Sequence, residues 1–181
     1  ITSGEPAGIG PDICLDLAQA GLSCRCVVLG DKDLLRRRAA LLGKQITLRY
    51  FNPHRPSENP IRQGELEVWH IPLPDVCEAG RLNPANAPYV LQLLDTACRG
   101  VSDGLFAAIV TAPLHKGVIN DGRASSRFFS GHTEYLAEKG GVEQVVMMLA
   151  GGGLRVALVT THLPLKDVAA AVTQPLIESV G

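Results

Sequence analysis

The sequence predicts an α/β protein whose mostly parallel sheet carries an antiparallel hairpin. The run 105–110 (LFAAIV) is continuously apolar, which is typical of a strand buried on both faces of a parallel sheet. It follows a helical pattern at 83–101 and a strand-like alternation at 65–71, and this order favours a right-handed parallel crossover. Two further apolar runs, 145–150 and 154–160, are separated by three glycines and predict the hairpin.

Composition bounds the size of the fold and the class of ligand. The 181 residues, 46% of them hydrophobic, suffice for one α/β domain or for one domain and part of another. A net charge of -1 gives no global field for nucleic acid, so an anionic ligand must be held by local groups. No apolar run approaches the roughly 20 residues that span a bilayer, and no signal-peptide pattern opens the chain. We expect a soluble, cytoplasmic protein with a small-molecule ligand and no nucleic-acid or membrane partner.

The five cysteines form no C-x-x-C pair and lie mostly in apolar contexts. We therefore predict reduced core residues rather than a disulfide framework. A metal site built on Cys24 and Cys26 would need further thiol or imidazole ligands at suitable spacing, and the sequence offers no such cluster.

A glycine-rich turn, Gly4 to Gly10, opens the chain and leads into a helix. Pro11 suits the first helical position, and Asp12 complements the positive end of the helix dipole. Such a loop can accept an anion or a carbonyl, or it can be a tight turn without a ligand. The pattern is not G-x-G-x-x-G, because Ile13 stands where the third glycine belongs, so a Rossmann dinucleotide site is not supported.

The following elements are predicted from periodicity and turn residues. Strands are expected at 26–30 and 46–50, and helices at 31–42, 133–139 and from 174 onward. The cluster Arg36 to Arg38 is interpreted as a solvated helix face. The proline-rich segment 52–60 is expected to be an exposed loop, an excursion from the fold. His70 is expected to be a structural residue rather than a ligand.

The predicted domain organisation is a first α/β domain at 1–129 and the incomplete beginning of a second at 130–181. The chain starts at Ile1 within a strand-like pattern, and its last helical pattern stops without the turn residues that usually end a helix. We therefore expect a piece of a longer protein.

The stretch 111–134 concentrates imidazoles, hydroxyls, an amine and glycines after an apolar strand, which predicts a binding site. Lys116, next to His115, could neutralise a phosphate or carboxylate, or be an ordinary surface lysine. His132 and Thr133 follow a glycine that lets backbone approach a ligand, although the same residues could simply begin a helix.

His162 follows another strand end and is a candidate metal ligand or, without partners, a structural histidine. A Ser-His-Asp hydrolase is not indicated, because no G-x-S-x-G occurs.

Five segments together resemble the 4-hydroxythreonine-4-phosphate dehydrogenase family of vitamin B6 biosynthesis. They are SGEPAGIGPD at 3–12, TAPLHKGVIND at 111–121, SGHTE at 130–134, VVMMLA at 145–150 and RVALVTTHLPLKDV at 155–168. The resemblance implies a three-layer α/β/α fold like that of isocitrate and isopropylmalate dehydrogenases. It also implies a homodimer whose active site is completed by the partner subunit. The implied reaction is NAD- or NADP-dependent oxidation and decarboxylation of 4-phosphohydroxy-L-threonine, toward pyridoxal 5'-phosphate, with a divalent metal (Zn, Mg or Co) held by three histidines.

Carried over by position, His132 and Thr133 match the family's substrate-binding pair, and His162 matches its first metal ligand. His115, Lys116 and the Gly4 to Gly10 loop match family motifs in supporting roles. The other two metal histidines and the substrate-binding Lys, Asn and Arg are expected beyond residue 181, so we expect the 181-residue chain alone to be inactive. The segment 122–129 looks a few residues longer than usual in the family.

Three alternatives stay open at this point. The substrate could be a related four-carbon sugar-acid phosphate, or the chain could be a catalytically inert binding or oligomerisation module. Acyl transfer to phosphate, as in phosphotransacetylases, rests on analogy of fold alone.

Overall fold

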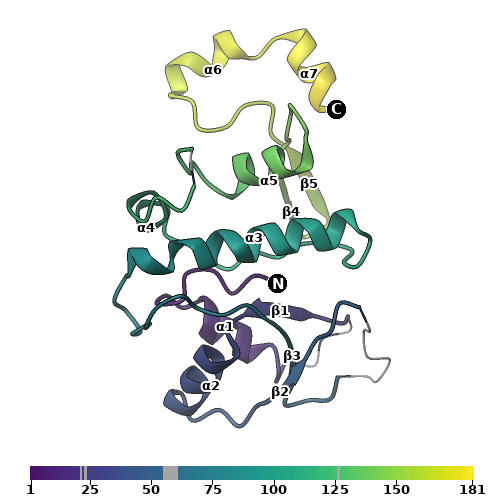
Figure 1. Cartoon of the computed structure of the whole chain (residues 1–181). Helices are drawn as coiled ribbons and strands as arrows, with labels where there is room; N and C mark the ends of the chain where they lie inside the picture. Colours follow the sequence, from purple (N-terminus) through teal and green to yellow (C-terminus); the bar gives the residue numbers. More distant parts are fainter. Residues whose placement is uncertain (21, 23, 55–60, 126) are drawn as a thin grey trace. The chain divides into compact units, whose positions relative to one another are not determined.

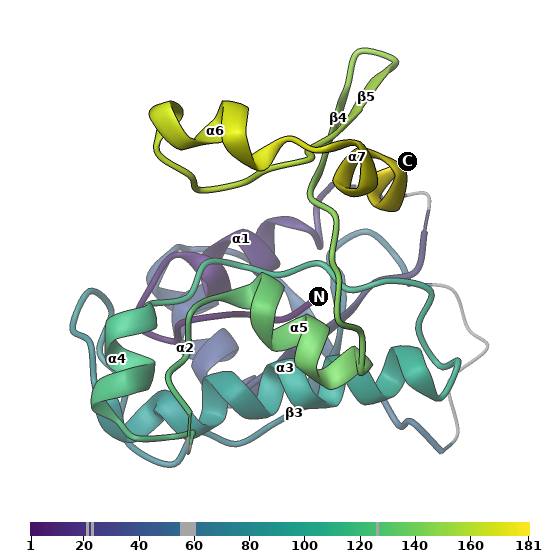
Figure 2. The same cartoon turned by 90° about the horizontal axis from the view of Figure 1, so that it is seen from above.

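The computed structural model describes residues 1–20, 22, 24–54, 61–125 and 127–181, and it divides into two compact units, Ile1–Lys139 and Gly140–Gly181 (Figure 1). The predicted boundary lies between 129 and 130, one helix earlier. Helix α5 (His132–Gly140) stays with the first unit because Tyr135 Oη donates to Asp95 Oδ1 at 2.7 Å and Lys139 Nζ lies 2.7 Å from the same oxygen. In Figure 2, α5 accordingly lies obliquely against the long helix α3 (Ala87–Ser102).

The first unit is built on a parallel three-stranded sheet in the order β1-β3-β2. The strands are β1 (Val27–Gly30), β2 (Thr47–Tyr50) and β3 (Glu65–His70). Val28 pairs with Val68, and Leu48 with Leu66, so the apolar positions of the three strands are in register. Helix α2 (Lys32–Leu41) connects β1 to β2, which are parallel strands of the same sheet.

Helices cover both faces of this sheet, which gives the predicted three layers. On one face, β1 and β3 pack Val28 and Val68 against α1 (Gly10–Asp16) and α2. On the other face Leu29 packs against α3, which is preceded by the short 3-10 helix η1 (Pro84–Asn86). Alternate residues of one strand therefore enter two different cores, as the pleat of a β-strand requires.

The prediction of a buried strand at 105–110 is wrong. The segment forms no named strand, and its end contacts the sheet through the pairing of Thr2 with Leu29 and Thr111. Val110 is 59% exposed, and the run lines a hollow of about 440 Å³. With a strand partner on one side alone, the apolar residues are not enclosed.

The second unit contains the predicted hairpin, β4 (Met148–Gly151) and β5 (Leu154–Ala157). Gly152 and Gly153 have φ of 56° and 83°, a left-handed turn that favours glycine. Within the described residues the two strands pair with each other in a sheet of their own and do not join the parallel sheet. Helices α6 (Leu165–Ala171), which periodicity does not predict, and α7 (Gln174–Val180) complete the unit.

Arg38 corrects the interpretation of its cluster as a solvated face. Arg36 and Arg37 are exposed, but Arg38 is 8% exposed. Its Nε donates to Asp12 Oδ1 at 2.7 Å, its Nη2 also pairs with that carboxylate, and Nη2 donates to Gly8 O at 3.0 Å. The side chain therefore ties α2 to the start of α1 and to the glycine-rich loop.

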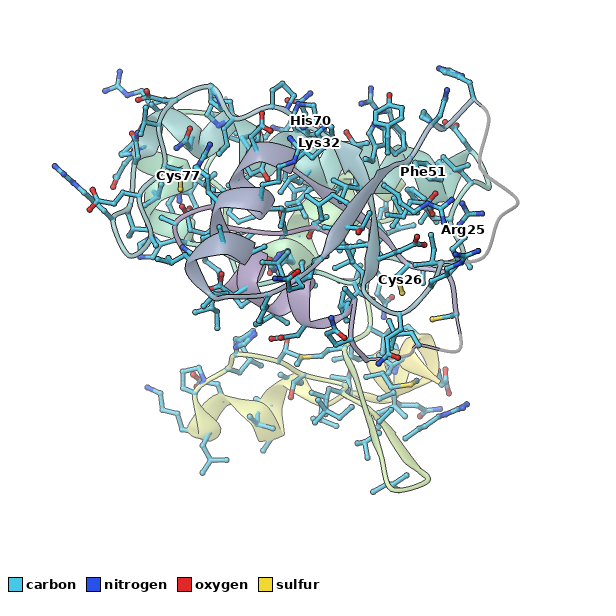
Figure 3. The ribbon with its side chains drawn as sticks, turned by 90° about the horizontal axis from the view of Figure 1, so that it is seen from below. Arg25, Cys26, Lys32, Phe51, His70 and Cys77 are labelled. Carbon is cyan, nitrogen blue, oxygen red and sulfur yellow. The ribbon has the colours of Figure 1, made fainter. Side chains whose placement is uncertain are left out.

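The sequence also makes predictions for the cysteines and for His70. All five cysteines are free, but Cys14 alone is buried, so the prediction of core cysteines is wrong for the other four. His70 is structural, as predicted: its Nδ1 accepts the Lys32 N–H at 3.1 Å, and the two residues lie side by side in Figure 3. Residues 55–60 of the predicted excursion lie outside the described residues. None of the helices in the described ranges is long and apolar enough to cross a membrane.

Candidate functional site

The glycine-rich loop lies directly on the segment that follows 105–110. Glu5 N donates to Pro113 O at 2.9 Å. Gly4 has a φ of 69°, and a Cβ there would lie 2.2 Å from Pro113 O. A Cβ at Gly10 would lie 2.1 Å from Ser3 O. The two glycines are therefore required for the close approach of these backbone segments.

A buried tyrosine connects the loop to the carboxyl end of β1. Tyr89 Oη lies 3.0 Å from Ser3 Oγ and accepts the Asp31 N–H at 3.0 Å. The Asp31 carboxylate in turn accepts from Leu34 N at 2.6 Å, capping α2, and from Leu73 N at 3.1 Å. This network holds the loop at the sheet edge where α/β proteins bind ligands.

Glu5, in the centre of the loop, is a buried acid that sequence reasoning missed. It is 4% exposed, and its Oε1 accepts the Ala7 N–H at 3.1 Å, whereas its Oε2 has no hydrogen-bond partner in the described structure. Burial raises the pKa of Glu5, while the Ala7 N–H and the nearby His115 oppose that shift. An acidic residue between Gly4 and Pro6 was the sequence signal that could have identified it.

His115 caps helix α4 (Lys116–Asp121): its Nδ1 accepts the Val118 N–H at 3.1 Å. In the neutral imidazole the proton therefore lies on Nε2, which makes that atom a donor. The side chain is exposed.

Lys116 and His132 are brought together by the fold of the segment between them. Asn120 Nδ2 donates to Phe129 O at 3.1 Å, and Phe129 N donates to Asn120 Oδ1 at 2.8 Å. A Cβ built on Gly131 would lie 3.1 Å from Lys116 Nζ. The ammonium group thus lies close to Gly131, the residue before His132, and a side chain at Gly131 would crowd it.

His132 begins α5 with one ring nitrogen that lacks a partner. Its Nε2 is buried and makes no hydrogen bond within the described residues. Burial lowers the pKa of His132, and the Lys116 charge lowers it further, which favours the neutral imidazole. Thr133 follows on the same helix and is exposed. A buried polar atom without a partner is costly, so a ligand group that bonds Nε2 would be favoured.

His162 lies in the second unit, between β5 and α6, exposed and with a φ of 58°. Across the described residues, no three His, Cys, Asp or Glu side chains gather as metal ligands do. The structure therefore brings His132 and Lys116 together, and it places Glu5 in the glycine-rich loop and His115 at the start of α4. His162 belongs to the second unit.

Comparison with known sequences identifies relatives along the whole chain. The sequence profile described as pyridoxal phosphate biosynthetic protein PdxA matches residues 22–181. A 4-hydroxythreonine-4-phosphate dehydrogenase of Neisseria meningitidis serogroup B is 74% identical over 181 residues, which are 100% of this chain and 54% of that protein. The enzyme of the same name from Chromobacterium violaceum is 54% identical over 99% of this chain and 53% of its own length. The chain spans about half the length of the curated relatives it matches.

Solved structures give the same result for the fold. The 4-hydroxythreonine-4-phosphate dehydrogenase of Klebsiella pneumoniae matches with a TM-score of 0.88 at 32% identity, over 99% of this chain and 54% of that one. A terephthalate 1,2-cis-dihydrodiol dehydrogenase from Burkholderia xenovorans LB400 matches with a TM-score of 0.68 at 27% identity, over 99% of this chain and 52% of that one.

Proposed function

Because the chain belongs to the family of pyridoxal phosphate biosynthetic protein PdxA, we propose that it is part of an NAD-dependent dehydrogenase acting on 4-phosphohydroxy-L-threonine. The relatives' names support oxidation of this substrate. Oxidation of its secondary alcohol gives a β-keto acid, whose loss of carbon dioxide is the proposed second step.

The unpartnered Nε2 of His132 beside the Lys116 ammonium is the observation that carries this proposal. A neutral imidazole can bond a hydroxyl or a carboxylate, and a lysine attracts a phosphate or carboxylate as a point charge. A phosphorylated hydroxy acid offers all three groups. His132 would thus orient the substrate, with Thr133 beside it, and Lys116 would hold an anionic end.

The cofactor and metal enter this proposal differently. NAD, when bound, would accept the hydride from the substrate. The described residues supply one candidate metal ligand, His162, and do not by themselves fit a three-histidine metal centre. We therefore assign no step to a metal and derive none through His162.

The test is NADH formation by the full-length protein with 4-phosphohydroxy-L-threonine. His132→Ala should lower kcat/KM about 10- to 100-fold, because a hydrogen bond to a charged group contributes about 1.5–3 kcal/mol. Lys116→Met should raise KM, whereas Lys166→Met, at an exposed position in α6, should not. Wild-type kinetics in the His132 variant would contradict the assignment.

Two substrate comparisons sharpen this experiment. If Lys116 binds the phosphate, Lys116→Met should change KM little with unphosphorylated 4-hydroxythreonine, because that substrate has no phosphate for the lysine to bind. Preferred turnover of a four-carbon sugar-acid phosphate would establish the alternative substrate. The isolated 181-residue chain should be inactive, and sedimentation of the full-length protein should give a dimer if the active site is shared.

A further inference from the structure

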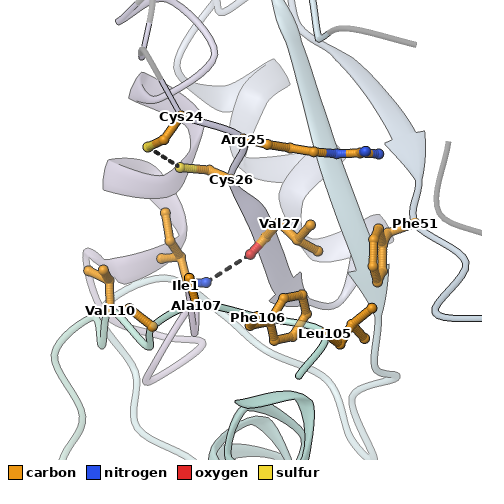
Figure 4. A pocket seen from close by; sticks show the side chains of 11 residues that line it. Ile1, Cys24, Arg25, Cys26, Val27, Phe51, Leu105, Phe106, Ala107 and Val110 are labelled. Carbon is orange, nitrogen blue, oxygen red and sulfur yellow. Dashed lines mark hydrogen bonds between the residues drawn. The ribbon is translucent and has the colours of Figure 1, made fainter. Parts of the chain in front are cut away.

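Cys24 and Cys26 form a pair of thiols on the segment that enters β1. Their Sγ atoms lie 3.8 Å apart, and Figure 4 shows both sulfurs on one side of the chain while Arg25 extends to the other. Cys24 is exposed and Cys26 is half-buried, beside the hollow lined by Phe51 and Phe106. The pair lies outside the proposed substrate site.

Arg25 fixes the backbone between the two thiols. Its Nε donates to Glu67 Oε2 at 2.8 Å and its Nη2 donates to Glu67 Oε1 at 2.7 Å. The Glu67 side chain is 1% exposed and belongs to the central strand β3. A two-point bond to a buried strand holds Arg25 in one orientation, and Cys24 and Cys26 both point away from it (Figure 4).

We propose that Cys24 and Cys26 are a dithiol modification site that a low-molecular-weight disulfide, such as glutathione disulfide, converts into an intramolecular disulfide. The sulfurs already lie in contact, so ring closure needs rotation about side-chain bonds and a small backbone adjustment. The two cysteines are separated by one residue, and a bond in such a small, exposed ring is readily reduced again.

The reaction balances as two thiol-disulfide exchanges. The Cys24 thiolate attacks one sulfur of glutathione disulfide, which forms a mixed disulfide and releases one glutathione thiolate. The Cys26 thiolate then attacks the Cys24 sulfur and releases the second glutathione. The protein loses two protons and two electrons, and glutathione disulfide is reduced to two thiols. Cys24 attacks first because it is exposed, whereas burial raises the pKa of Cys26.

The other three cysteines provide internal controls. Burial raises the pKa of Cys14 to about 11, and it also raises the pKa values of Cys77 and Cys98. Each is therefore a weaker nucleophile at neutral pH than an exposed thiol.

Trypsin cleaves after arginine, so cleavage at Arg25 separates the two cysteines and makes the bond directly detectable. The full-length protein is incubated with glutathione disulfide, quenched with acid and N-ethylmaleimide, denatured, digested and analysed by mass spectrometry. We expect the peptide that ends at Arg25 and the peptide 26–32 to remain joined without reductant and to separate with it. The peptide that ends at Arg25 also carries Cys14, so fragmentation and a Cys14→Ser variant assign the bond.

Three variants make the outcome decisive. Cys24→Ser and Cys26→Ser should abolish the joined peptides and leave a glutathione adduct on the remaining thiol. Arg25→Lys keeps the charge and the tryptic site but loses the two-point bond, so ring closure should slow several-fold. Stable glutathione adducts on the wild-type pair, a bond to Cys14, or reaction at Cys77 and Cys98 as fast as at the pair would each overturn the proposal.

Discussion

Replacing Tyr89 with Phe tests whether the glycine-rich loop is held by the buried hydroxyl. Tyr89 is 1% exposed, and its hydroxyl contacts Ser3 Oγ and the Asp31 N–H, each at 3.0 Å. Phe preserves the ring packing, so the change removes these two bonds and leaves the Asp31 N–H without its acceptor. One net hydrogen bond contributes about 1 kcal/mol, and a buried unsatisfied donor costs about 1–3 kcal/mol. We expect a loss of about 2–3 kcal/mol in the free energy of unfolding.

The matched control is Tyr135→Phe. The Tyr135 hydroxyl donates to Asp95 at 2.7 Å from a half-buried position, where water can replace the lost bond. Tyr135→Phe should lower the free energy of unfolding by less than about 1 kcal/mol. Urea unfolding of the full-length protein measures both variants, and hydrogen exchange at the Asp31 amide reports on the network itself. Equal costs for the two variants, or unchanged protection of that amide in Tyr89→Phe, would refute the reasoning.

Three further predictions concern the same region. Arg38→Met should lower the free energy of unfolding by about 1–3 kcal/mol, because it removes an ion pair and a bond to a backbone carbonyl. In the same urea titration, the exposed control Arg37→Met should change the free energy of unfolding by no more than about 0.5 kcal/mol. Gly10→Ala places a methyl group 2.1 Å from a backbone oxygen and should lower the stability of the fold by about 3 kcal/mol. Gly151→Ala, whose methyl group meets nothing within 4 Å, should leave the thermal melting temperature nearly unchanged. Burial and the neighbouring lysine lower the pKa of His132 from its ordinary 6.5. Just below pH 6.5 the unfolded state therefore binds more protons than the folded state, and the free energy of unfolding falls as the pH drops through this window. His132→Asn should flatten that part of the stability profile, and an unchanged slope just below pH 6.5 would show that another group titrates there.

The sequence by itself determined the order and type of most elements, because these depend on local periodicity and turn residues. Helix α1 begins at the predicted glycine-proline pair, β1 lies in the strand predicted at 26–30, β3 lies in the alternating segment 65–71, and three glycines mark the hairpin. The motifs that carry the family resemblance are also continuous in sequence. For that reason the order of residues alone is enough to select His132 and Lys116 as candidate site residues.

Only the tertiary structure decided which polar side chains are buried and what they contact. Arg38 could not be distinguished from Arg37 by pattern, since its partner Asp12 lies 26 positions away. The close approach of Lys116 to Gly131 depends on how the segment between them folds back. Burial of a polar group depends on contacts between distant segments, and local sequence does not encode them. The same reason explains why the apolar run at 105–110 is not a buried strand: a strand needs partners, and its own residues do not supply them.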